Sequence, residues 1–294
     1  MRFHTAAIAG FSFCVMVGWI GGRADAQATP PAGAGSTVDS SGASVQHVGE
    51  TVLDTTRTTQ PASQPTTEPA DQAAIKHGRN GTSPDGRFTQ LHDAFLWRGK
   101  EAPMGLLFIG DSITEGWIHN AKNQAPDVWK SHYWQYNPAD FGIGGDRTEH
   151  VLWRIDHGEL DGLTPKVVVV MIGTNNVPPG NPAEEIVAAD TKIVQEIHDK
   201  IPDAKVLLLG IFPRGADPKD PKVADMRAEI KQINSELAKL DDGNKTRYLD
   251  IGDKFLDADG VIQKDIMSDA LHPTPKGYQI WADAMQPLLD EMMK

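Results

Sequence analysis

Short apolar runs alternate with longer segments in which apolar residues recur every three or four positions, from about residue 87 to the end of the chain. The apolar runs predict strands at 105–109, 139–142, 167–172, 205–211 and 246–251. The periodic segments predict helices at 88–97, 147–157, 182–201, 221–241 and 275–293. The run at 167–172 is apolar throughout, as in strands of parallel sheets that are covered on both faces. This alternation predicts an α/β fold, a three-layer α/β/α sandwich around a central, mainly parallel five-stranded sheet.

Prolines place the beginnings of two predicted helices. Asn181 followed by Pro182 matches the residue preferences at the cap and the first position of a helix. Pro273 and Pro275 follow His272 closely, so we expect that histidine in a stiff loop ahead of the last helix.

The first 26 residues are typical of a secretory signal peptide. An apolar stretch at 5–20 follows Met1-Arg2, and Ala24-Asp25-Ala26 forms an A-x-A cleavage site. A membrane anchor is the alternative, but the stretch is short, so we expect export to the periplasm, cell surface or medium and no membrane span in the mature chain. Cys14, the single cysteine, lies inside this stretch, so the mature protein is expected to have no disulfide.

Residues 27–86 are rich in Ala, Thr, Ser, Pro, Gly and Gln and poor in large apolar side chains, which predicts a disordered tether. Residues 87–294 remain as one domain of about 208 residues, long enough for a full core. The chain has 28 Lys and Arg against 40 Asp and Glu, a formal net charge of -12. This balance argues against nucleic acid or an anionic membrane as the main partner and leaves the oligomeric state open.

The most informative stretch is 106–117, where an apolar run is broken by Gly110-Asp111-Ser112. We expect Ser112 at the carboxyl end of a buried strand, the edge at which open α/β sheets hold reactive groups. A serine in such a turn is structural in most proteins, and Thr114 stands where the G-x-S-x-G pattern has its second glycine. Asp111 is interpreted as a turn-organising carboxylate.

Three further blocks supply what a nucleophilic serine requires. Gly144-Gly145 follow a strand and open a helix, so their N–H groups can face a cleft, although a plain turn or a phosphate loop is an alternative. Asn175 ends the strongest strand and can donate its amide to an oxyanion or form an Asx turn. Asp269 and His272 are three residues apart, and helix-like backbone curvature would put them on one side.

Together these blocks resemble the SGNH (GDSL) hydrolase superfamily, over residues 88–292. Phe-Gly-Ile-Gly-Gly-Asp at 141–146 and Val-Leu-Trp-Arg at 151–154 are most similar to the catalytic subunits of intracellular platelet-activating-factor acetylhydrolase. The resemblance implies a flavodoxin-like SGNH hydrolase fold.

The resemblance also implies a role for each matching residue. Ser112 would be the nucleophile, His272 its base, and Asp269 the carboxylate that orients the imidazole. The oxyanion hole would consist of the backbone N–H groups of Ser112 and Gly145 and the side chain of Asn175. No cofactor and no metal is implied.

The remaining candidates have structural interpretations. Four histidines lack metal-ligand spacing: His119, His132, His150 and His157. Four tryptophans are expected to pack, with stacking on a sugar near Ser112 as the alternative: Trp117, Trp129, Trp134 and Trp153. Arg214 either lines the cleft or forms a surface salt bridge.

These observations predict an exported serine esterase acting on short-chain, above all acetyl, esters. Apolar insertions typical of a lid are lacking between the blocks, which favours an open cleft and short acyl groups. Export favours O-acetylated glycans, so a carbohydrate O-acetylesterase is the first hypothesis. A lipid esterase of the platelet-activating-factor-acetylhydrolase or lysophospholipase type is the alternative. An inactive, surface-tethered binding protein is a third hypothesis of another class.

Overall fold

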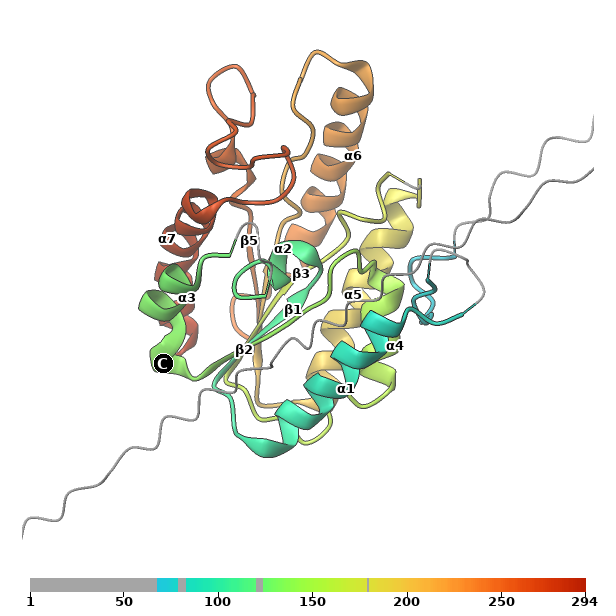
Figure 1. The fold of residues 1–294 in the computed structure, drawn as a ribbon, viewed down its shortest axis with the longest axis vertical. Helices are drawn as coiled ribbons and strands as arrows, with labels where there is room; N and C mark the ends of the chain where they lie inside the picture. Colours follow the sequence, from blue (N-terminus) through green and yellow to red (C-terminus); the bar gives the residue numbers. More distant parts are fainter. Residues whose placement is uncertain (1–67, 79–82, 120–123, 179) are drawn as a thin grey trace, which may run out of the picture. The chain divides into compact units, whose positions relative to one another are not determined.

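The computed structural model describes residues 68–78, 83–119, 124–178 and 180–294 and confirms the predicted fold class (Figure 1). The strands are β1 (Leu106–Gly110), β2 (Pro138–Gly142), β3 (Val167–Met171), β4 (Lys205–Leu209) and β5 (Thr246–Leu249). All neighbours are parallel in the order β2-β1-β3-β4-β5, the order of flavodoxin-like sheets. The predicted signal peptide, residues 1–26, and most of the predicted tether lie outside the described residues.

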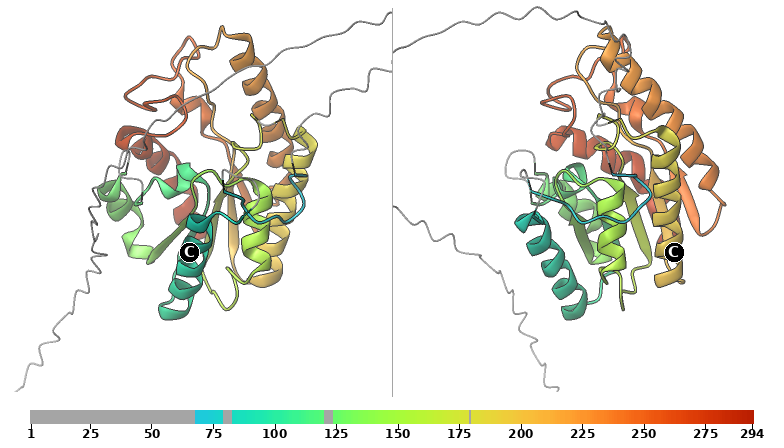
Figure 2. Two further views of the ribbon diagram at one scale, coloured as in Figure 1. Left: turned by 45° about the vertical axis from the view of Figure 1, so that its right-hand side comes forward. Right: turned by 90° about the vertical axis from the view of Figure 1, so that its right-hand side faces the viewer.

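Helices cover both faces of this sheet (Figures 1 and 2). One face carries α1 (Gly86–Glu101), α4 (Thr148–Asp156), α5 (Ala183–Lys200) and α6 (Pro221–Leu237). The other carries α3 (Pro126–Tyr133) and α7 (Pro275–Met292). The short elements are α2 (Ser112–Glu115), η1 (Trp134–Tyr136), η2 (Ala238–Leu240) and η3 (Gly252–Phe255).

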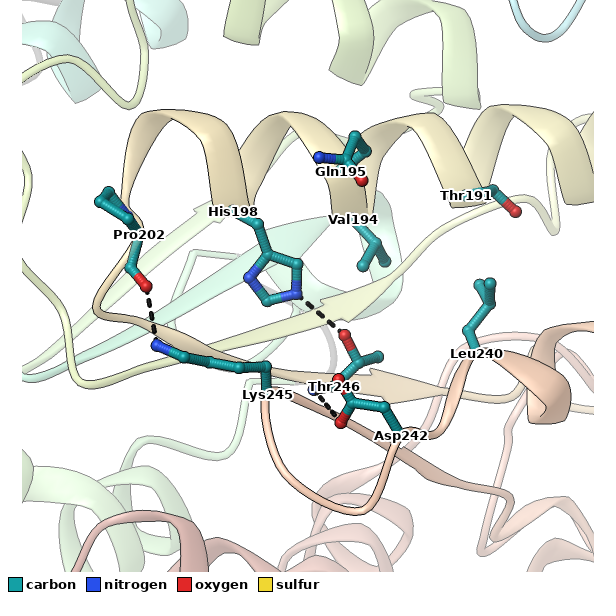
Figure 3. A pocket seen from close by; sticks show the side chains of 9 residues that line it. All are labelled: Thr191, Val194, Gln195, His198, Pro202, Leu240, Asp242, Lys245 and Thr246. Carbon is teal, nitrogen blue, oxygen red and sulfur yellow. Dashed lines mark hydrogen bonds between the residues drawn. The ribbon is translucent and has the colours of Figure 1, made fainter.

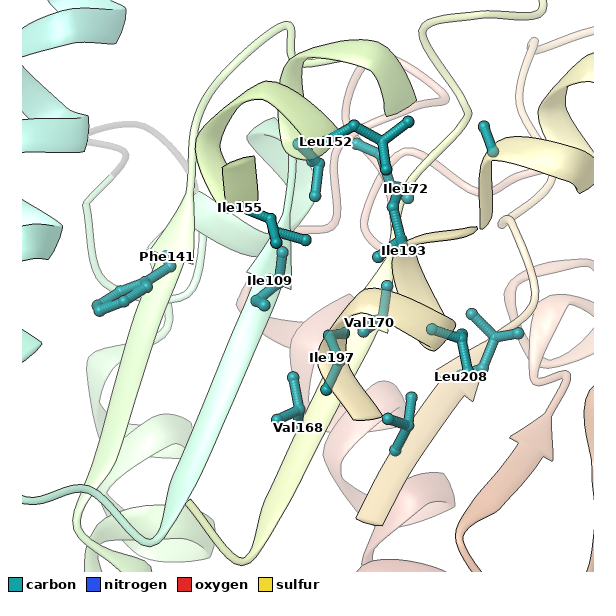
Figure 4. Close-up of a cluster of buried hydrophobic side chains, with 14 of the residues drawn as sticks. Ile109, Phe141, Leu152, Ile155, Val168, Val170, Ile172, Ile193, Ile197 and Leu208 are labelled. Carbon is teal, nitrogen blue, oxygen red and sulfur yellow. The ribbon is translucent and has the colours of Figure 1, made fainter. Parts of the chain in front are cut away.

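Two apolar clusters join the sheet to its helical layers, because successive strand residues point to opposite faces. Leu107 and Ile109 of β1 are buried under α4, whereas Phe108 is buried on the face of α3 and α7. Figure 4 shows the first cluster, in which Ile109 lies near Ile155 of α4. Burial of each such side chain contributes about 1.5–3 kcal/mol, which explains why the central strands have no polar position.

The periodicity analysis did not predict α3. This helix has eight residues, and polar residues dominate its sequence. Its two buried aromatic residues, Trp129 and Tyr133, lie with their ring centroids 4.9 and 5.1 Å from that of Phe108. Tertiary packing on β1, not local periodicity, therefore accounts for α3.

Residues 68–78, here called the N-terminal strap, correct the predicted boundary between tether and domain at residue 87. Ala70 is fully buried, and its carbonyl accepts a hydrogen bond from Thr148 Oγ1 at 2.8 Å. The Ala74 N–H donates to the Glu149 carbonyl at 3.0 Å. The segment packs through a small side chain and backbone hydrogen bonds, neither of which requires large apolar residues, so its composition misled the prediction.

The strap also explains a shift at the beginning of α5. Pro182 occupies the cap position and α5 begins at Ala183, one residue later than predicted. The Asn181 side chain does not cap the helix but donates to the Glu68 carbonyl of the strap at 3.0 Å. In the described part of the chain, no helix has both the length and the apolar character that a membrane crossing requires.

Candidate active site

The predicted nucleophile and oxyanion residues follow three adjacent strands. Ser112 follows β1, the loop 143–147 follows β2, and Asn175 follows β3. The sheet order reverses at β1, and ligands of open α/β sheets bind in the crevice that such a reversal leaves at the carboxyl edge. The topology therefore brings these residues to one place although 63 positions separate Ser112 from Asn175.

Ser112 is the first residue of α2 and lies 2.9 Å (Oγ to Nε2) from the imidazole of His272. Asp111 caps this short helix, since its Oδ1 accepts the Ile113 N–H at 2.9 Å. From α7, the Tyr278 hydroxyl donates to the Ile113 carbonyl at 2.8 Å. The turn is thus held from both sides, and the interpretation of Asp111 as a turn-organising residue is confirmed.

His272 and Asp269 pair as the sequence predicted, but the backbone between them is not helix-like. His272 Nδ1 lies 2.7 Å from Asp269 Oδ2, while Asp269 Oδ1 accepts the backbone N–H groups of Leu271 (3.1 Å) and His272 (2.8 Å). Ala270 adopts a left-handed conformation, with φ of 56°. An Asx-type turn therefore brings the two side chains together.

This acid–base pair is open to solvent. The His272 side chain is 25% exposed and that of Asp269 54%. Burial acts to raise the pKa of Asp269, but hydrogen bonds from the backbone N–H and the imidazole of His272 outweigh it and lower the pKa. Asp269 thus stays ionised and can hold Nδ1–H, which leaves Nε2 to accept a proton from Ser112.

The loop after β2 runs beside the Ser112 hydroxyl. A Cβ placed on Gly144 would lie 3.7 Å from Ser112 Cβ. The Gly144 N–H is already bound to Glu115 Oε2 at 2.7 Å. Gly145 is exposed at φ of 77°, a conformation that favours glycine, and its N–H has no partner among the described residues. Of the two glycines, Gly145 is therefore the one with a free donor.

Asn175 joins this loop to the nucleophile turn. Its Nδ2 donates to the Asp146 carbonyl at 2.9 Å and lies 3.4 Å from Asp111 Oδ2. Asp111 is fully buried, and burial, opposed by the Ile113 N–H and by the charge of His272, raises its pKa to about 6. The Asn175 residue is half-buried, and both acceptors of its amide group are protein oxygens.

Arg214 holds the loop after β3 instead of forming a surface salt bridge. Its Nη1 donates to the Thr174 carbonyl at 2.7 Å and to Thr174 Oγ1 at 3.2 Å. Burial lowers its pKa, against the opposing attraction of Asp111 and Asp269. The guanidinium of Arg214 therefore interacts electrostatically with Asp111 and Asp269, while its hydrogen bonds hold the loop after β3.

A buried charge network that sequence reasoning missed lies behind the glycine loop. Arg154 is fully buried, with Nη1 2.6 Å from Glu159 Oε1 and Nε 3.1 Å from Asp146 Oδ2. Although burial alone lowers the pKa of Arg154, the carboxylates of Glu159 and Asp146 raise it, so the guanidinium stays charged. The signal for this network was an arginine within the largely apolar run 151–155, since buried charges require partners.

The four tryptophans considered in the sequence analysis do not provide a sugar platform at the site. Trp117 and Trp129 are buried and pack with Phe108, so the stacking alternative is wrong for both. Trp153 stacks on the His157 ring at 3.7 Å between centroids. Trp134 is 66% exposed but lies just before β2, at the edge of the sheet opposite Ser112.

Three donors do gather around Glu149, yet they do not fit a metal ion. Atoms of Glu68, Glu149 and His150 lie within 4.8 Å of one another. His150 Nδ1 accepts the Arg147 N–H at 3.0 Å, so the neutral ring carries its proton on Nε2 and has no lone pair to offer. The Arg147 guanidinium already neutralises Glu149, with Nε 2.8 Å from Oε1.

A cavity of about 420 Å³ lies far from this chemistry, between α5 and the beginning of β5 (Figure 3). Its polar groups bind one another: His198 Nε2 lies 2.9 Å from Thr246 Oγ1, and Lys245 Nζ donates to the Pro202 carbonyl at 2.7 Å. The amino ends of the strands lie here, so this hollow belongs to the scaffold.

Comparison with known proteins gives relatives that match most of this chain. A sequence model of the GDSL-like lipase/acylhydrolase family matches residues 108–280. The platelet-activating factor acetylhydrolase IB subunit alpha1 of Homo sapiens is 35% identical over 206 residues, 70% of this chain and 84% of that protein. Subunit alpha2 of Rattus norvegicus is 35% identical over 226 residues, 76% and 92% of the two chains. A GDSL-like lipase of Bacteroides thetaiotaomicron shares the fold at 19% identity and a TM-score of 0.55, over 68% and 97% of the two chains.

Proposed function

The chain belongs to the GDSL-like lipase/acylhydrolase family, which makes it a carboxylic ester hydrolase, and from that membership we propose that it cleaves short-chain esters through an acyl-enzyme on Ser112. The observation that carries the proposal is the connected chain of Ser112, His272 and Asp269, with contacts of 2.9 and 2.7 Å.

Each residue acts on a defined atom. Ser112 Oγ attacks the acyl carbon while His272 Nε2 accepts the hydroxyl proton, and Asp269 holds the imidazolium through Nδ1–H. The carbonyl oxygen becomes an oxyanion that accepts hydrogen bonds from the N–H groups of Ser112 and Gly145. Asn175 Nδ2 becomes the third donor by exchanging its longer contact, 3.4 Å to Asp111 Oδ2, for the oxyanion. The ester C–O bond then breaks, and His272 protonates the leaving alcohol. Water repeats the sequence and releases the acid.

We propose acetyl as the acyl group that this chain removes. The relatives at 35% identity are acetylhydrolases by name, and this chain covers 84–92% of their length. We therefore assign acetyl and other short acyl esters as substrates.

The two candidate substrates, acetylated carbohydrates and acetylated ether phospholipids, differ in the alcohol part of the ester. Carbohydrate O-acetyl esters follow from the predicted export of a chain with a signal peptide at 1–26, but the exposed Trp134 lies at the wrong edge of the sheet to stack on a sugar. Acetylated ether phospholipids follow from the names of the relatives. The complete set of Ser112, Asn175, Asp269 and His272 favours an enzyme over an inactive, surface-tethered binding protein.

The decisive experiment is hydrolysis of nitrophenyl acetate by the purified chain and by Ser112→Ala. We expect the variant to lose on the order of 10⁴–10⁶ in kcat and all labelling by a fluorophosphonate. Ser235→Ala is the matched control, because Ser235 is an exposed serine of α6 that bonds only to the Gln232 carbonyl. Full activity of Ser112→Ala would refute the proposal.

A substrate panel then ranks the candidates. Faster turnover of nitrophenyl acetate than of butyrate and octanoate supports the acetyl assignment. Release of acetate from acetylated xylan favours the carbohydrate candidate, and turnover of an acetylated ether phospholipid without activity on xylan favours the lipid candidate.

A further inference from the structure

The N-terminal strap is held on the domain at several points that do not involve its lysine. The Glu68 carbonyl accepts from Asn181, the Ala70 carbonyl from Thr148, and the Ala74 N–H donates to α4. On the other side of Lys76, its own carbonyl accepts the Asp85 N–H at 2.8 Å. The place of the Lys76 side chain is thus determined by the backbone around it.

Lys76 directs its ammonium group at the glycine loop. Nζ donates to the Gly144 carbonyl at 2.5 Å and to Asp146 Oδ1 at 3.3 Å. These two acceptors flank Gly145, and a Cβ on Gly145 would lie 3.2 Å from Nζ. The lysine side chain is only 14% exposed, so the contact is largely shielded from solvent.

Three backbone groups next to Gly145 are held by side chains from elsewhere in the fold, and the Asp146 N–H donates to the Ile143 carbonyl within the loop. Glu115 accepts the Gly144 N–H, Lys76 binds the Gly144 carbonyl, and Asn175 binds the Asp146 carbonyl. Glu115 is itself paired with Arg87. The Gly145 N–H, without a partner among the described residues, is the donor that remains for a substrate.

Lys76 also balances the buried charges behind the loop. Asp146 and Glu159 are both buried and share the single guanidinium of Arg154. Lys76 is the second cation, and His150, whose Nδ1 lies 3.9 Å from Asp146 Oδ1, is neutral because burial lowers its pKa to about 2. Burial raises the pKa of Asp146 to about 7, although Arg154 and Lys76 both act to lower it. Without Lys76, two buried carboxylates would share one cation, and Asp146 would bind its proton more tightly or move.

We propose that Lys76 is a positioning residue of the oxyanion hole and that the N-terminal strap is part of the catalytic unit. The inference rests on the proposed esterase function. It concerns a residue that lies before the segment matched by the family model, 108–280. Lys76 acts at two points: it fixes the Gly144 carbonyl, which belongs to the same peptide unit as the Gly145 N–H, and it favours the ionised form of the Asp146 carboxyl group.

The test compares Lys76→Met, which removes the charge, with Lys76→Arg, which keeps it, in the full chain. Lys192→Met is the matched control, because Lys192 contacts the same strap at the Asp71 carbonyl (3.5 Å) and is remote from the glycine loop. The readouts are kcat and KM for nitrophenyl acetate, the pH profile of kcat, and the Tm. Lys76→Gln replaces the methionine variant should that variant not fold.

We expect Lys76→Met to lose on the order of 10–10² in kcat, with KM within about twofold, because misplaced donors weaken only the transition state. The acid limb of its pH profile should move to higher pH, since Asp146 then binds its proton more tightly. Lys76→Arg should recover most of the activity.

A folded Lys76→Met with the kcat and pH profile of Lys192→Met would overturn the inference, and so would a lower Tm with unchanged kcat. These results presuppose an active wild type. A wild-type chain that neither turns over the ester nor labels at Ser112 would instead refute the proposed function.

Discussion

The two sides of the site are built in different ways, although both meet at Ser112. The oxyanion side stands on the ends of β1, β2 and β3 and is backed by the buried ion pairs of Arg154. The proposed base side consists of Asp269 and His272, which lie on the loop before α7. The carboxylate of Asp269 contacts both the backbone N–H and the imidazole of His272, three residues further along the chain. The side chains of His272 and Asp269 are a quarter and a half exposed.

This difference suits the chemical role that we propose for each side. An oxyanion is stabilised by donors that are already oriented in a site of low dielectric constant, so these donors require a rigid, buried support. The base exchanges protons with an alcohol and with water, so it must be accessible. The proposed oxyanion donors therefore have a buried, rigid support, whereas the imidazole of His272 is in contact with solvent.

The largest effect tests the oxyanion side. Asn175→Ala should lower kcat for nitrophenyl acetate by on the order of 10²–10³, with little change in KM, because the amide is used fully only in the transition state. Unfolding in urea checks that the loss of the Asp146 contact does not destabilise the chain. A kcat within threefold of the wild type would remove Asn175 from the oxyanion hole.

The second effect is the pH dependence of stability that the buried Asp111, on the oxyanion side, should cause. The pKa of Asp111 is raised from its ordinary 3.8 to about 6 by burial, so the folded state binds this proton more tightly than the unfolded state does. Its contribution to stability is complete below about pH 4 and is lost as the pH rises through 6, by about 3 kcal/mol.

Asp111→Asn removes this proton-binding group, and urea unfolding between pH 4 and 7 measures the difference. The wild type should lose about 2 kcal/mol more free energy of unfolding over this interval than the variant does. Parallel curves for the two proteins would mean that Asp111 is not a titrating buried carboxyl.

The smallest effect tests the base side. Asp269→Ala should lower kcat by on the order of 10–10², less than Asn175→Ala, because a carboxylate that is half exposed acts through solvent of high dielectric constant. Fluorophosphonate labelling of Ser112 should become slower but not cease. A loss larger than that of Asn175→Ala would reverse the comparison and make Asp269 the more rigidly coupled group.

Much of this molecule could be predicted from its sequence. The run 167–172 predicted β3 because a strand covered on both faces is apolar at every position. Ser112 and Asn175 were expected near each other because the ends of parallel strands share one edge, and they follow the neighbouring strands β1 and β3. His272 was expected in a loop ahead of the last helix, and its imidazole lies 2.9 Å from Ser112 Oγ. Gly145 was preferred over Gly144 as a donor because it directly precedes Asp146, and its N–H has no partner among the described residues.

Tertiary structure decided the rest. The sequence of the N-terminal strap is that of a tether, and only its contacts with Asn181, Thr148 and Glu149 show that it belongs to the domain. Lys76 and Asp146 are 70 positions apart, and Trp117 is buried by neighbours from α3 and α7. Periodicity and motifs report what a residue does relative to its near neighbours in the chain. Charge balance and burial depend on distant segments meeting in space, and no local pattern encodes that meeting.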